Sequence, residues 1–89
     1  MSVSIDRLME EARRRFESFG LRQGRTLKDA WTGLGFPSEY KSVVEAGLMT
    51  PVGGKTTPRV LNWYRLTPKG VDEYRRRFPG SEDGTSLKY

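Results

Sequence analysis

The segment "GGKTTPR", residues 53–59, contains the residue types that contact phosphate groups. Its two glycines predict a flexible tip, and its cations and hydroxyls are Lys55, Thr56, Thr57 and Arg59. Lysine and arginine neutralise phosphates, and threonine hydroxyls bind phosphate oxygens without reading a base sequence. A plain solvated loop has the same composition, so both interpretations stay open.

Most catalytic and metal chemistry is excluded by composition. The chain has no cysteine and no histidine, which removes disulfides, Cys/His metal sites and imidazole catalysis. The adjacent acids Glu10-Glu11 and Asp72-Glu73 would point about 100° apart on a helix, so they do not form a catalytic pair. We therefore expect no enzyme and no cofactor.

The net charge of +5 favours a polyanionic partner, more often nucleic acid than a membrane surface. The N-terminal residues "MSVSIDRLMEEARRRF" lack the pattern of a signal peptide, and no run approaches the roughly 18 apolar residues of a membrane span. With no cysteine, the expected location is the cytoplasm. On the first helix, the pairs Glu10–Arg14 and Glu11–Arg15 are expected to make a solvated, ion-paired face.

Helical spacing of apolar residues predicts three helices in the first half of the chain, over residues 4–19, 26–34 and 38–46. The expected N-caps are Ser4, Thr26 and Ser38. The glycines expected to end the first and third helices in the left-handed conformation are Gly20 and Gly47. The inward face expected for the first helix holds Ile5, Leu8, Met9, Ala12, Phe16 and Phe19. The inward face expected for the second helix holds Leu27, Ala30, Trp31 and Leu34. The inward residues expected for the third are Tyr40, Val43 and Val44.

In the second half the period shortens, which predicts a hairpin of "LMTPV" and "RVLNWYRL", residues 48–52 and 59–66. Alternation places Tyr64 and Leu66 in the core, and Leu61 and Trp63 on the opposite face. Thr67-Pro68 then begins a helix that runs to Phe78, and Gly70 is expected to permit its close packing. One domain over residues 1–79 and a flexible tail over 80–89 are expected.

The stretches "EAGLM" and "YRLTPKG" resemble the core of the MarR and PadR repressors in the winged helix-turn-helix superfamily. The resemblance implies an α+β winged helix: a three-helix cluster, a two-stranded β-hairpin wing and a C-terminal helix. It also implies a transcriptional regulator that binds double-stranded DNA, with helix 38–46 in the major groove and wing 53–59 on the backbone. Those repressors usually add a long dimerisation helix where this chain ends, so a homodimer would use the first helix.

The expected DNA-binding residues are Arg25, Lys28, Ser38, Lys41, Ser42, Lys55, Thr56, Thr57 and Arg59. Residues 37–48 carry two glutamates against one lysine, which is a weak charge for a recognition helix because phosphate neutralisation supplies much of the affinity. That acidity keeps an alternative open, a winged-helix module that binds a protein through Leu61 and Trp63.

Overall fold

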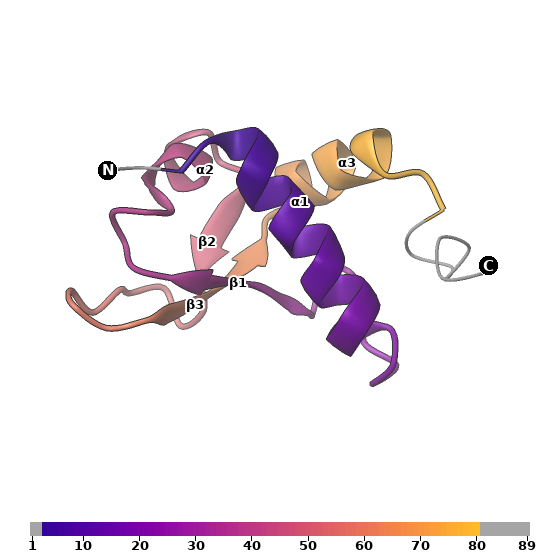
Figure 1. Cartoon of the computed structure of the whole chain (residues 1–89), viewed down its shortest axis with the longest axis horizontal. Helices are drawn as coiled ribbons and strands as arrows, with labels where there is room; N and C mark the ends of the chain where they lie inside the picture. The colour runs from indigo at the N-terminus through magenta and orange to yellow at the C-terminus, as the bar shows by residue number, and fades with distance from the viewer. Residues whose placement is uncertain (1–2, 81–89) are drawn as a thin grey trace.

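The computed structural model describes residues 3–80, so the expected tail lies almost wholly outside the described residues. The chain forms an α+β domain with a three-stranded antiparallel sheet in the order β1-β3-β2 (Figure 1). Its elements are α1 (Ile5–Arg15), a π-helical turn (Phe16–Gly20), β1 (Trp31–Gly35), α2 (Lys41–Glu45), β2 (Met49–Pro51), β3 (Asn62–Leu66) and α3 (Pro68–Arg77).

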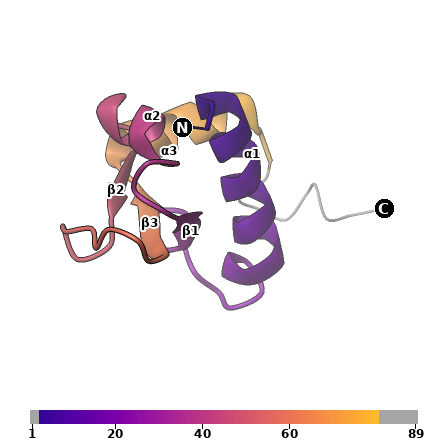
Figure 2. The same cartoon turned by 60° about the vertical axis from the view of Figure 1, so that its left-hand side comes forward.

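β3 is the central strand, and its alternation sets the two faces of the sheet. Tyr64 and Leu66 are buried in a core shared with all three α-helices, whereas Trp63 and Arg65 are exposed on the other face. Figure 2 shows α1 standing beside the β1 edge, with α2 and α3 at one end of the sheet. The predicted faces are confirmed for Trp63, Tyr64 and Leu66, but the strands are shorter than the predicted 48–52 and 59–66, so Leu61 lies in the loop before β3.

The helix predicted over 26–34 is wrong. Thr26 and Asp29 do meet, through a hydroxyl-to-carboxylate hydrogen bond of 2.9 Å, but they close only one turn before β1 begins. Gly33 and Gly35 explain the outcome, because a Cβ on either would lie 2.7 or 2.6 Å from the ring of Tyr40. Two glycines also disfavour a helix, so the segment becomes a third strand and the predicted three-helix cluster is not formed.

α2 is shorter than predicted, because residues 37–40 form a turn rather than its first turn. Ser38 therefore is not the cap, and the actual N-cap, Tyr40, makes no capping side-chain bond. Tyr40 and Val43 are buried as expected, but Val44 is exposed. The predicted ending is confirmed: Gly47 has φ 76°, and the Leu48 amide donates to the Val43 carbonyl at 2.9 Å.

The first helix ends differently from the prediction. Gly20 lies inside the π-helical turn, where the Leu21 amide donates to the Phe16 carbonyl at 2.8 Å, and the left-handed glycine is Gly24. This wider turn leaves Phe19 exposed, although its spacing predicts a core position.

The start of α3 follows the prediction. Thr67 is the N-cap, its hydroxyl accepts from the Gly70 amide at 3.0 Å, and Pro68 occupies the first turn. Val71 and Tyr74 are buried, and the Tyr74 ring packs edge-on against Phe78 at 5.1 Å. The capping groups Thr67, Pro68 and Gly70 lie within four residues of one another, so local capping rules suffice to predict this helix start.

Candidate nucleic-acid interface

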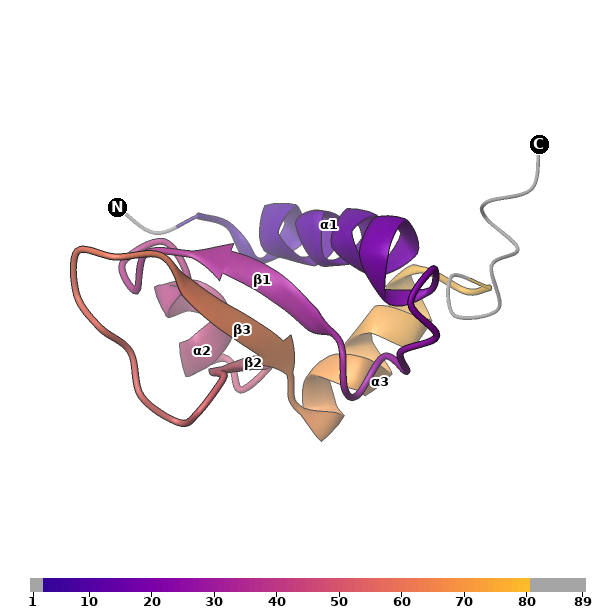
Figure 3. The same cartoon turned by 90° about the horizontal axis from the view of Figure 1, so that it is seen from below.

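The loop between β2 and β3, residues 52–61, is organised by one side chain. Asn62 accepts from the Thr57 amide at 2.9 Å and donates to the carbonyls of Thr57 and Val60, each at 2.9 Å. Figure 3 shows the loop extending beyond the rest of the domain, at the end away from the C-terminal end of α3. The C-terminal part of the segment predicted to be a flexible tip is therefore held by hydrogen bonds to Asn62.

The loop carries two exposed cations. Lys55 and Arg59 are exposed, and neither makes an ion pair within residues 3–80. Arg59 also has φ 66°, an uncommon conformation for a residue with a side chain. Both charges are thus available to an anion.

An open hollow of about 340 Å³, which we call the α2–loop hollow, lies between α2 and the 52–61 loop. Its lining includes Pro37, Lys41, Val44, Glu45, Thr56 and Tyr64. The structure thus brings together two residues predicted for the site, Lys41 and Thr56, from segments 15 positions apart. The Glu45 carboxylate lies in the same hollow and opposes an anion there, although a carboxylate can accept from a cytosine amino group.

Tyr64 adds an unused polar group to this hollow. Its ring is fully buried and stacks on Tyr40 with the centroids 4.3 Å apart, and its hydroxyl has no hydrogen-bond partner within residues 3–80. Burial, followed by the charge of Glu39, raises the pKa of Tyr64. The hydroxyl therefore stays protonated at neutral pH and can donate or accept.

Ser42 does not face outward as predicted. Its hydroxyl donates to the Val3 carbonyl at 2.6 Å, and the Val3 amide donates to the Glu39 carbonyl at 3.1 Å. These bonds tie the N-terminal segment to α2, so Ser42 is engaged within the domain.

The remaining predicted residues are dispersed. Ser38 is exposed in the turn before α2, and Lys28 is exposed in the turn before β1. Arg25 follows the π-helical turn, where its Nε donates to Gln23 at 3.3 Å. The predicted set is therefore not one continuous surface, and its compact part is Lys41 with the loop.

Arginines on the helices are largely paired. Arg7 lies 3.8 Å from Glu11 and Arg13 lies 3.2 Å from Glu10, in place of the predicted pairs with Arg14 and Arg15.

The apolar stripe of α1, which includes Leu8, is buried within the domain, so a homodimer through α1 would have to use its charged side.

Glu73 lies between two arginines of α3. It bonds Arg77 at 2.6 Å and also contacts Arg76, while Arg77 reaches Asp6 of α1 at 2.7 Å. The hydrogen bond from Arg77, assisted by both guanidinium charges, lowers the pKa of Glu73. Arg77 therefore links α3 to α1, whereas Arg76 is paired within α3.

Sequence reasoning missed a second hollow, which we call the aromatic pocket. It has a volume of about 260 Å³, and its lining includes Arg15, Phe19, Gln23, Arg25, Trp31 and Trp63. The indole centroids of Trp31 and Trp63 are 5.6 Å apart, because β1 pairs with β3. The exposed tryptophan Trp31 could have indicated this pocket from the sequence. Because Trp31 was predicted to lie on a helix, its contact with Trp63 was not predicted.

Comparison with protein-family models, with curated proteins and with solved structures finds no match to this chain. Within residues 3–80, none of the helices has the length and apolar character needed to cross a membrane. The same residues contain no cluster of three or more carboxylates that could hold a metal ion.

Proposed function

We propose that this protein is a small winged-helix DNA-binding protein that acts as a transcriptional regulator. α2 would face the major groove of double-stranded DNA, and the 52–61 loop would contact the phosphate backbone. The observation that carries the proposal is the α2–loop hollow, where Lys41 of α2 lies beside Thr56 of a loop whose two cations make no ion pair within residues 3–80.

The fold is compatible with this class, since a hairpin follows a short helix and pairs with an earlier strand. α2 has only five residues, about 7.5 Å of helix at 1.5 Å per residue, so it can present few side chains to bases. Its exposed members are Lys41, Val44 and Glu45. Phosphate contacts from the loop would therefore supply most of the affinity.

Titration of labelled duplex DNA at low and moderate salt tests the proposal. We expect binding that weakens steeply with salt, and a Lys55→Glu/Arg59→Glu variant that binds at least tenfold more weakly, because it replaces two phosphate-neutralising charges with repulsive ones.

A matched control is Arg14→Glu/Arg22→Glu, which makes the same change in net charge at exposed positions of α1 and the segment after it. This control should bind more tightly than the loop variant. Absence of binding at low salt, or equal losses in both variants, would overturn the proposal.

A second candidate is a protein-interaction module. Trp63 is 39% exposed on the face of β3 opposite the core, and Leu61, at the end of the loop just before β3, is 55% exposed. If a protein is the partner, Leu61→Ser would abolish its binding, and duplex DNA would not bind the wild type at low salt.

A further inference from the structure

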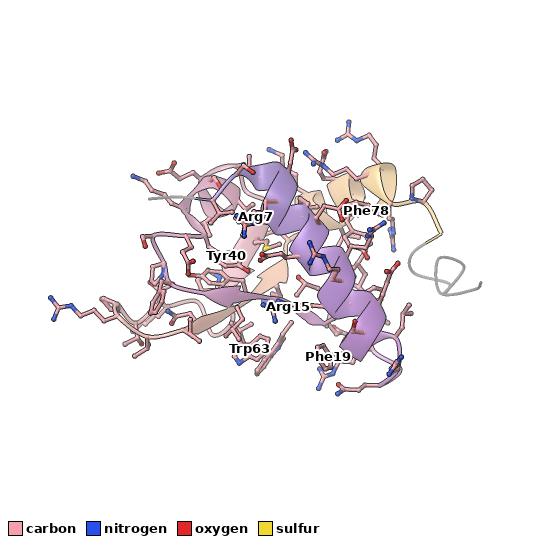
Figure 4. All side chains as sticks on the ribbon, viewed as in Figure 1. Arg7, Arg15, Phe19, Tyr40, Trp63 and Phe78 are labelled. Carbon is pink, nitrogen blue, oxygen red and sulfur yellow. The ribbon has the colours of Figure 1, made fainter. Side chains whose placement is uncertain are left out.

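The aromatic pocket lies between the π-helical turn and the exposed face of the sheet. Phe19 comes from the π-helical turn, Trp31 from the edge strand and Trp63 from the central strand. In Figure 4, Phe19 and Trp63 lie at the same edge of the molecule. Phe19 is 62% exposed and Trp31 47%, so three aromatic rings meet solvent around one hollow.

Cationic donors line the same pocket. The Arg15 Nε is buried and has no hydrogen-bond partner within the described residues. Arg25 uses its Nε on Gln23, which leaves its terminal amino groups for a ligand. No carboxylate lies among the lining residues, unlike in the α2–loop hollow.

The residues that line the aromatic pocket indicate which ligand it would bind. Aromatic rings stack on planar bases of any sequence, and arginines bind the attached phosphate or stack on the base themselves. The amide of Gln23 offers both a donor and an acceptor to a base edge. A second copy of this chain fits poorly, because a two-fold contact here would place Arg15 and Arg25 against the same residues of the partner.

We propose that the aromatic pocket binds an unpaired nucleobase with its phosphate, either in a single strand or as a free nucleotide. The base would stack within the group Phe19, Trp31 and Trp63, and Arg15 and Arg25 would hold the phosphate. The proposal does not depend on duplex binding, since the two hollows share no lining residue.

Intrinsic fluorescence provides a direct test, because Trp31 and Trp63 are the two tryptophans of the chain and both line the pocket. Oligothymidylate should quench their emission saturably, and Phe19→Ala should weaken that binding about tenfold, as expected for the loss of one base–aromatic stack. Arg25→Gln should weaken it as well. If dTMP also quenches the emission, the pocket binds free nucleotides as well. If only the oligonucleotide quenches it, the pocket binds single strands.

Phe36→Ala is the matched control, because Phe36 is another exposed phenylalanine and does not line the pocket. It should bind like the wild type, and circular dichroism should show both alanine variants folded. The loop variant Lys55→Glu/Arg59→Glu should retain saturable quenching, which separates this proposal from duplex binding. No quenching, equal behaviour of the two phenylalanine variants, or equal quenching by poly-L-glutamate would overturn the proposal.

Discussion

Gly70 shows how a single residue can set the distance between two elements. A Cβ at this position would lie 1.8 Å from the carbonyl oxygen of Leu48, which is backbone and cannot rotate away. We predict that Gly70→Ala lowers the free energy of unfolding by roughly 1–3 kcal/mol, the usual cost of overpacking. Chemical denaturation should measure this loss in Gly70→Ala. The control variant Asp72→Ala, at an exposed position of α3, should unfold like the wild type. Equal midpoints for the two variants would contradict this role.

Glu73 gives the fold a pH dependence that can be measured. Because Arg77 lowers its pKa, the folded state holds this proton less tightly than the unfolded chain does. The resulting stabilisation is complete above the ordinary glutamate pKa of about 4.3 and is lost as pH falls through the lower folded value. We therefore predict that Glu73→Gln lowers Tm at neutral pH and that the difference disappears in acid. An unchanged Tm for Glu73→Gln at neutral pH would contradict the prediction, and exposed Glu45→Gln is the control.

Among the elements, β1 shows where sequence patterns were insufficient. The helical spacing from Leu27 to Leu34 is genuine, and Leu27 is buried, but the choice between helix and strand depended on Tyr40. Its ring needs the space above Gly33 and Gly35, which is a contact between elements that spacing alone does not reveal. α3, by contrast, follows from its own cap and stripe.

The 52–61 loop is an element whose order depends on Asn62. We predict that Asn62→Ala accelerates amide exchange at Thr57 and lowers the free energy of unfolding by about 1–2 kcal/mol, because it removes three hydrogen bonds at a partly exposed site. Asn62→Asp should keep the bond to the Thr57 amide and so show intermediate exchange. Unchanged exchange in Asn62→Ala would mean that the loop is ordered by other contacts.

Over the whole molecule, the candidate sites were only partly predictable. The loop cations could be predicted because charge and loop composition are local properties, and the exposure of Trp63 because strand alternation is local too. Leu61 is exposed as predicted, but it lies in the loop and not in a strand. The aromatic pocket could not be, since it requires Phe19 to leave the core and Trp31 to join the sheet. Both changes follow from packing between distant segments.

The distribution of charge over the whole molecule leads to a final prediction. Arg76 is held by Glu73, whereas Lys55 and Arg59 are unpaired within the described residues, so equal charges should contribute unequally to DNA binding. Each lost phosphate contact should reduce the magnitude of the slope of log K against log salt by about 1. We therefore expect a reduction of that size for Lys55→Gln and for Arg59→Gln, and little change for Arg76→Gln. If all three variants showed the same slope, binding would depend on net charge alone, and the loop would have no special part in it.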